Sequence, residues 1–219
     1  MSKYAILPKT PWTANSLWSL ESRPLLMLCL TFVVVGIGEG LLLLSNLGSA
    51  PWTILSQGLS LQMHVSVGWT SFLISLLVMF LWLPLRLRPG IGTILNVVVI
   101  ALFLGITVKI VPIPTALWAR WAYAIVGILC FGVGTAFYLT CHQGAGPRDG
   151  LMVGICQRFH WKVGVVRTSI EVAVCLFGFL LGGTFGIGTL VYALSIGWIV
   201  QVTLKFIRHS ACFKQNLPS

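Results

Sequence analysis

Six long apolar runs, each bounded by charged residues or proline, dominate the sequence. They cover residues 24–45, 67–85, 91–111, 118–140, 165–184 and 187–206. A helix needs about 20 predominantly apolar residues to cross the hydrocarbon core of a bilayer. Charged residues make up only 8% of the chain, against roughly 25% in an ordinary globular domain, so a water-soluble surface cannot be built. The sequence therefore predicts an all-α membrane protein with about six transmembrane helices in contact with the lipid bilayer.

The parts outside these runs are short. We predict a cytoplasmic N-terminal segment over residues 1–23, one membrane domain over 24–206 and a cytoplasmic tail over 207–219. The first 23 residues contain no apolar stretch that ends in a small-residue cleavage site, so the first helix is expected to remain in the membrane.

Positive charge is distributed unevenly around the runs. Of the 14 Lys and Arg residues, all but Lys109 and Arg120 lie near the two ends of the chain or around every second connection. Cytoplasmic loops carry the excess of Lys and Arg in membrane proteins, so both termini are expected in the cytoplasm. Because topology explains the net charge, no nucleic-acid partner is expected.

Two connecting stretches, residues 46–66 and 142–162, each contain a short apolar segment that starts at a proline. Such a segment is too short to span a bilayer and predicts a re-entrant or interfacial helix. Glycine ahead of Pro51 and Pro147 gives the backbone freedom to turn, and proline suits the first position of a helix. Each proline therefore marks the predicted start of a short helix.

An internal repeat appears when the chain is shifted against itself by 96 residues. Residues 36–93 then show 17 identities in 58 positions with residues 132–189, and roughly a third of that number is expected by chance. The matches include Pro51 with Pro147 and His64 with His160. The first repeat covers about 24–111 and the second about 118–206. Because each holds three predicted spans, the second copy enters the membrane from the opposite side, as in secondary transporters with inverted repeats.

The starts of the two short helices form the candidate site. Exposed N–H groups and the positive end of the helix dipole suit an anionic or polar group there. The predicted substrate-binding residues are Pro51, Trp52, Pro147, Arg148 and Asp149. The alternative interpretation is an interfacial hairpin in which Asp149 satisfies the helix start and Arg148 contributes to the positive-inside bias.

Other polar residues within the runs have functional and structural interpretations. An ionisable group such as Glu39 at membrane depth has a high free-energy cost. Glu39 therefore either binds solute or couples transport to protons, or it belongs to a buried ion pair or a helix cap. Arg167 and Glu171 are spaced as a helical ion pair. The paired glycines at 36, 38, 132 and 134 indicate close helix packing.

Several activities lose support from the absence of their motifs. The chain has no phosphate-binding loop, nucleophile elbow or zinc-binding helix motif. We therefore expect no enzyme activity, no catalytic residues, no metal and no cofactor. Six short spans are compatible with a homodimer.

Four motifs together resemble the bacterial YczE/YyaS/YitT family of membrane proteins. They are the glycine pattern at 36–40, the segment 47–52, the Gly-Ile-Gly-Thr at 90–93 and the segment 144–152. The resemblance covers roughly residues 25–205 and implies location in the bacterial cytoplasmic membrane. Thr53 stands where an acid is expected in the first short helix, which weakens a symmetric two-carboxylate site with Asp149.

The resulting hypothesis is a secondary transporter of a small polar or anionic solute that works by alternating access between two inverted repeats. Glu39 would bind or couple beside the two short helices. The alternative is a non-transporting accessory protein that docks a cytoplasmic partner through residues 141–164 and the tail.

Overall fold

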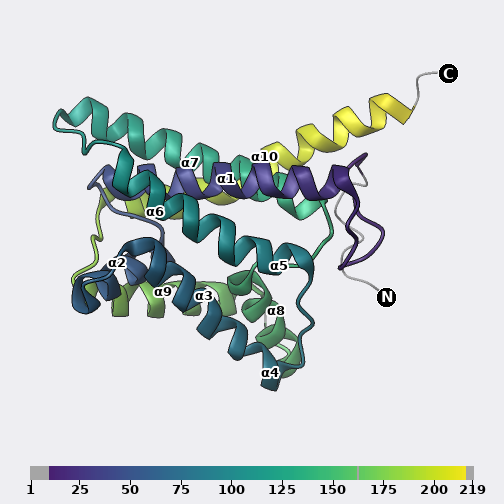
Figure 1. Cartoon of the computed structure of the whole chain (residues 1–219), viewed down its shortest axis with the longest axis horizontal. Coiled ribbons are helices and arrows are strands. Elements are labelled where there is room, and N and C mark those ends of the chain that lie inside the picture. The colour runs from purple at the N-terminus through teal and green to yellow at the C-terminus, as the bar shows by residue number, and fades with distance from the viewer. Residues whose placement is uncertain (1–9, 162, 216–219) are drawn as a thin grey trace.

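The computed structural model describes residues 10–161 and 163–215, and every secondary-structure element in these ranges is a helix (Figure 1). Residues 1–9 of the predicted N-terminal segment, Lys162 in the predicted connection and residues 216–219 of the tail lie outside the described residues. The elements are α1 (Ser22–Leu44), α2 (Pro51–Met63), α3 (Val67–Phe80), α4 (Trp82–Leu85), α5 (Ile91–Leu95), the π-helical turn η1 (Asn96–Ile100), α6 (Ala101–Ile110), α7 (Leu117–Thr140), α8 (Pro147–Phe159), α9 (Val163–Leu180) and α10 (Ile187–Gln215).

Five helical stretches among the described residues are long and apolar enough to cross a membrane. They are Ser22–Leu44, Val67–Leu85, Ile91–Ile110, Leu117–Thr140 and Ile187–His209. The prediction of an all-α, multi-pass membrane protein is confirmed. The predicted run at 165–184 does form a helix, α9, but α9 is not among these five. Helix α10 continues past the predicted run end at residue 206, since neither proline nor glycine interrupts residues 207–215.

The two short helices begin where the sequence predicts them. Each has 13 residues and carries its proline at the first position, where the missing N–H costs nothing. Each also ends at a histidine in the left-handed backbone region, His64 with φ 56° and His160 with φ 57°. The short α2 and α8 are therefore the same local structure built twice.

The connections before these helices also repeat at the 96-residue spacing. Gly48 has φ 116° and Gly144 has φ 113°, a region that L side chains rarely adopt. The two connections then exchange hydrogen bonds with the opposite repeat. The N–H of Gly92 donates to the carbonyl of Gln143 at 2.9 Å, and the N–H of Gly188 donates to the carbonyl of Leu47. The two halves are thus joined by equivalent contacts in both directions.

The long helices pack in a layer around the contact between α1 and α7 (Figure 1). Helix α10 lies against α7, and α6 lies against α1, while α2, α3, α8 and α9 lie on the other side of the molecule. Glycines permit the closest approaches. A Cβ on Gly38 would stand 2.8 Å from the carbonyl oxygen of Gly127, and one on Gly36 would stand 2.9 Å from that of Ile100. The predicted packing role of these glycines is confirmed.

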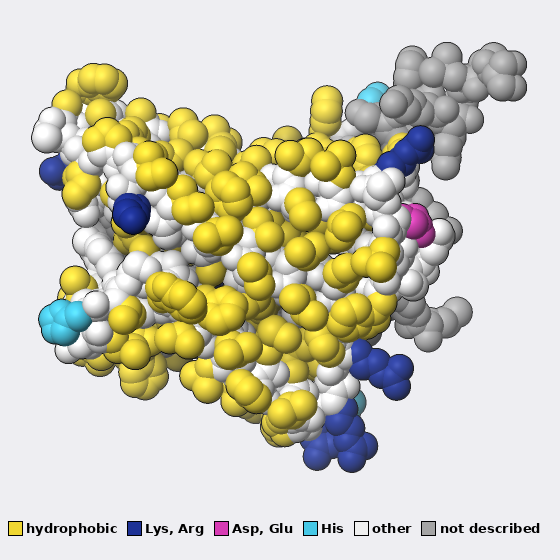
Figure 2. All heavy atoms as spheres, in the orientation of Figure 1, with side chains coloured by type: hydrophobic (Ala, Val, Ile, Leu, Met, Phe, Trp, Pro, Cys, Tyr) yellow, Lys and Arg dark blue, Asp and Glu magenta, His cyan; other side chains and the backbone are white. Residues whose placement is uncertain are grey.

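The surface agrees with a membrane environment. Figure 2 shows hydrophobic side chains over most of the visible face and Lys and Arg side chains gathered at its two ends. In Figure 1, α1 begins and α10 ends on the same side of the molecule.

Candidate functional site

A cavity of about 440 Å³ lies between the two groups of helices and takes lining residues from α1, α2, α3, α6, α7, α8, α9, α10 and η1. Five of the six predicted site residues line it: Glu39, Pro51, Trp52, Arg148 and Asp149. Pro147 is buried beside the cavity, where its carbonyl accepts a hydrogen bond from Trp82 Nε1 at 3.0 Å. The fold therefore brings the predicted residues of both short helices and α1 to one place.

Both sequence repeats contribute matching positions to this cavity. Pairs of lining residues 96 positions apart include Glu39 and Thr135, Trp52 and Arg148, Ser71 and Arg167, Ser75 and Glu171, and Asn96 and Tyr192. The first repeat supplies mainly neutral side chains at these positions and the second supplies both arginines. The two repeats thus contribute equivalent positions to the cavity lining, but the charged side chains at these positions differ between the repeats.

Glu39 forms a buried ion pair with Arg148. The distance from Arg148 Nη1 to Glu39 Oε1 is 3.2 Å, and the side chains are 20% and 1% exposed, respectively. Thr53 Oγ1 donates a longer hydrogen bond of 3.4 Å to the same carboxylate. The Arg148 guanidinium also lies 5.4 Å from the centroid of the Trp52 ring, within cation–π range. Of the two interpretations of Glu39, the buried pair is present, and it lies in the wall of the cavity.

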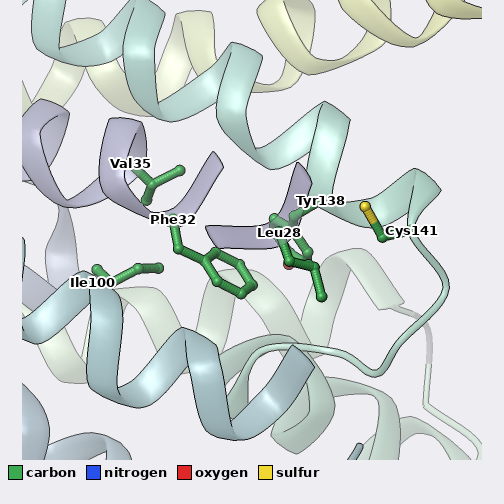
Figure 3. Packing of buried hydrophobic residues seen from close by; sticks show 6 residues of the cluster. All are labelled: Leu28, Phe32, Val35, Ile100, Tyr138 and Cys141. Atoms are coloured by element: carbon green, nitrogen blue, oxygen red, sulfur yellow. The ribbon is translucent and has the colours of Figure 1, made fainter. Parts of the chain in front are cut away.

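Asp149 has a different partner. It lies in the first turn of α8, where a negative charge is favoured by the helix dipole, and it accepts a hydrogen bond from the Tyr138 hydroxyl. The Tyr138 ring is fixed in a hydrophobic cluster with Leu28 and Phe32 (Figure 3), its centroid 5.5 Å from that of Phe32. Packing between α1 and α7 therefore orients the donor that meets Asp149.

The predicted ion pair within α9 is confirmed. Arg167 Nε lies 3.0 Å from Glu171 Oε1. Both residues also line the cavity, so the pair is part of the site and not merely a local helix contact. Together with Glu39 and Asp149, this places three of the four acidic residues of the chain around one cavity.

The cavity-lining residues, which run from Val35 to Val200, all fall within a region that matches DUF6198, a family of unknown function, over residues 22–205. The chain belongs to this family. The family description assigns no activity, so the geometry of the cavity has to carry any functional argument.

Three relatives show the same membership. A Haemophilus influenzae protein described as uncharacterized is 57% identical over 205 residues, which cover 94% of each chain. Bacillus subtilis YczE, described as an uncharacterized membrane protein, is 31% identical over 159 residues, 72% of this chain and 74% of its own. YyaS of Bacillus subtilis is 24% identical over 182 residues, 81% of this chain and 90% of its own. The predicted resemblance to YczE and YyaS is thus confirmed. No solved structure matches the chain.

The sequence analysis did not predict several of the residues that line the cavity. Ser71 and Ser75 lie inside an apolar run, but they are offset by 96 residues from Arg167 and Glu171, and this offset could have identified them. Asn96 begins the π-helical turn η1, a feature often found at functional sites. Tyr138 carried no sequence signal, because its role depends on the packing of α1 against α7.

The N-terminal segment also contributes to the site, which the sequence did not indicate. Thr13 Oγ1 donates to the carbonyl of Thr140 at 2.9 Å, and the N–H of Ala14 donates to the carbonyl of Cys141. Gln143 Nε2 donates to the carbonyl of Ser19 at 2.6 Å. These bonds fix the connection that leads into α8, so the segment supports the wall that holds Arg148 and Asp149.

Two comparisons identify this cavity as the candidate site among the described residues. A hollow of about 910 Å³ between α1, α3 and α6 is lined mostly by apolar side chains, and Lys109 is the one charged residue among the described residues that line it. Within the described ranges, no three His, Cys, Asp or Glu residues come together as metal ligands. The central cavity is thus the place where described charged side chains converge.

Proposed function

We propose that this protein is a secondary transporter that binds a small polar solute in the central cavity and works by alternating access. The observation that carries the proposal is the convergence of both short-helix N-termini and five charged side chains on one cavity within the membrane domain. Ionisable groups at membrane depth are costly and commonly mark substrate or ion pathways. Helix starts that point into a membrane cavity are a recurrent device for binding solutes in transporters.

The repeat supports an inverted arrangement of the two halves. Helix α9 would be the sixth crossing, with Arg167 and Glu171 on the face that lines the cavity. Its position in the second repeat corresponds to that of α3 in the first. Three crossings per repeat then give opposite orientations, with both termini in the cytoplasm and the protein in the bacterial inner membrane, as the distribution of Lys and Arg favours.

Equivalent contacts of the two short helices differ, as alternating access between the halves would require. A Cβ added to Gly58 of α2 would stand 2.5 Å from the carbonyl oxygen of Gly178 in α9 and 2.8 Å from the Cβ of Leu181. At the equivalent place in the other half, Gly154 of α8 meets the side chains of Leu85 and Leu87. The nearest atom is thus a backbone oxygen in the first contact and a side-chain carbon in the second. Exchange of these two packings between the halves would move the opening from one face of the membrane to the other.

The accessory-protein alternative receives less support at the start of its predicted docking region, although Phe159 and Trp161 near the end of that region are 56% and 60% exposed. It needs the region 141–164 to be available to a cytoplasmic partner. Cys141 and Gln143 are 0% and 1% exposed, and the N-terminal segment already occupies the hydrogen-bonding groups of this connection.

A flux experiment with a mixture of solutes tests the proposal. Purified protein in proteoliposomes is incubated with a defined mixture of polar metabolites, and the contents are quantified by mass spectrometry. The matched variants are Gly197→Leu and Ala193→Leu. Both residues are exposed on α10. Gly197 lines the cavity, and an added Cβ there meets no atom within 4 Å, whereas Ala193 is not among the lining residues.

We expect at least one solute to enter liposomes that contain the wild type or Ala193→Leu, and its entry to be lost with Gly197→Leu. Entry no faster than into protein-free liposomes for every metabolite, or equal entry with both variants, would contradict the proposal.

A further inference from the structure

We propose that Asp149 and Tyr138 form the recognition site for a cationic nitrogen of the solute, such as an ammonium, an amidinium or a protonated ring nitrogen. This inference rests on the proposed function, because it assigns the charge of the solute that the cavity takes. It replaces the anionic solute that a free Arg148 would have favoured.

The first argument is the pairing of charges around the cavity. Three carboxylates and two guanidinium groups line it. Glu39 is paired with Arg148, and Glu171 is paired with Arg167. Asp149 makes no ion pair with any described residue, although it belongs to the same cavity. The cavity therefore holds one carboxylate more than its own cations balance.

The second argument is the unused capacity of that carboxylate. An ionised carboxylate offers about four lone-pair positions to donors, and among the described side chains only Tyr138 donates to Asp149. The start of α8 stabilises the negative charge but supplies no counter-ion. Glu39 differs, since it is 2% exposed and already contacts Arg148 and Thr53. Asp149 is thus the carboxylate that can accept a donor from a solute.

The third argument is the aromatic character of the wall. Trp52, Phe131, Tyr138 and Tyr192 all line the cavity, and aromatic faces beside a carboxylate attract organic cations. The protein already uses this combination, since the Arg148 guanidinium lies over Trp52 while it pairs with Glu39. An organic cation at Asp149 would repeat the same chemistry in the same cavity.

An anionic solute meets the opposite situation. Both arginines of the cavity have carboxylate partners at 3.2 and 3.0 Å. An anion would compete with these carboxylates for the guanidinium N–H donors, and it would also meet the negative charge of Asp149, which has no ion-pair partner among the described residues. The cavity volume of about 440 Å³ also lies toward the lower end of ordinary ligand sites, roughly 300–1,000 Å³, so the solute is small.

Three probes of one shape test the charge preference directly. Benzylamine, benzyl alcohol and benzoate carry the same ring with a positive, neutral or negative group at neutral pH. Their binding to the full-length protein in detergent is measured by the rise in melting temperature, because a ligand of the native state stabilises it in a concentration-dependent, saturable way. We expect a saturable rise in melting temperature with benzylamine. The other two probes should need at least a tenfold higher concentration to give the same rise.

Three single-residue variants test whether the preference for benzylamine depends on Asp149 and Tyr138. Asp149→Asn should lower the affinity for benzylamine at least tenfold, and Tyr138→Phe should lower it severalfold. Glu21→Gln is the matched control, because Glu21 is the one acidic residue outside the cavity lining, and it should bind benzylamine like the wild type. The comparison of the three probes on the wild type holds even if a variant fails to fold.

The outcomes are separable from those of the flux experiment. Preference for benzoate, equal responses to the three probes, no response to any of them, or an unchanged response in a folded Asp149→Asn protein would each overturn the inference. Charge-selective binding without flux would remove the transport proposal and leave this site intact. Flux without a preference for benzylamine would leave the transport proposal intact and remove this site.

Discussion

Arg148 is the residue whose role the structure changes most. In the sequence it follows Pro147 at the start of a short helix, a position that suits an anion receptor. In the fold its guanidinium is held between the Glu39 carboxylate and the Trp52 ring. Trp52 is the residue 96 positions earlier, so the two equivalent positions contact each other across the cavity. The contact depends on α1 lying next to both short helices, which a single sequence does not specify.

Removal of the Glu39 carboxylate should therefore destabilise the protein. Loss of one partner from a buried ion pair costs about 3–5 kcal/mol, and we expect Glu39→Gln to fall at or below the lower end because the Arg148 side chain is 20% exposed. Thermal unfolding in detergent measures the effect. The double variant with Arg148→Gln should recover part of the loss, since no unpaired charge remains. A melting temperature of Glu39→Gln equal to that of the wild type would show that the pair contributes no stability.

Among the elements, the contact between α1 and α7 sets the geometry of the site. It carries Glu39 on one helix and Tyr138 on the other, and it is close because glycines face it. A Cβ on Gly38 would lie 2.8 Å from the Cβ of Cys130 and from the carbonyl oxygen of Gly127. A larger side chain has to separate the helices and so displace both functional residues.

Gly38→Val should lower stability by at least the roughly 1–3 kcal/mol typical of overpacked cores. The matched control is Gly197→Val, because the same change there meets no atom within 4 Å. Unfolding in detergent, followed by circular dichroism, compares the two. Equal stability of both variants would contradict the close approach of α1 and α7.

At the scale of the whole molecule, the two halves are joined by equivalent connections. Gly48 and Gly144 have nearly the same positive φ, and each faces a threonine of the opposite repeat, Thr189 or Thr93. An added Cβ at either glycine meets both an unfavourable backbone region and that threonine.

We therefore expect Gly48→Ala and Gly144→Ala to destabilise the protein by similar amounts, each more than about 1 kcal/mol. Melting temperatures of the two variants test the equivalence, and they are measured beside Gly197→Ala, which adds the same methyl group without a steric conflict and should not lower stability. A large effect at one glycine and none at the other would show that the connections are not equivalent.

Local features were predictable from the sequence, and long-range contacts were not. The starts of α2 and α8 at Pro51 and Pro147 follow from the conformational properties of glycine and proline, and the Arg167–Glu171 pair follows from helical spacing. The 96-residue offset also indicated that the two short helices belong together. The ion pair of Glu39 with Arg148 and the hydrogen bond from Tyr138 to Asp149 depend on how the helices pack. The sequence repeat gives the register of that packing but not the identity of the neighbours.

The most direct test of the central claim is the accessibility of a cysteine at position 197 from each side of the membrane. Gly197 lies near the middle of the span Ile187–His209 and lines the cavity. The Gly197→Cys variant, made in a chain whose six native cysteines are replaced, is treated with a membrane-impermeant thiol reagent in right-side-out and in inside-out vesicles. Alternating access predicts modification in both preparations. Modification from one side only, with none from the other at any time, would contradict a cavity that opens to both faces of the membrane.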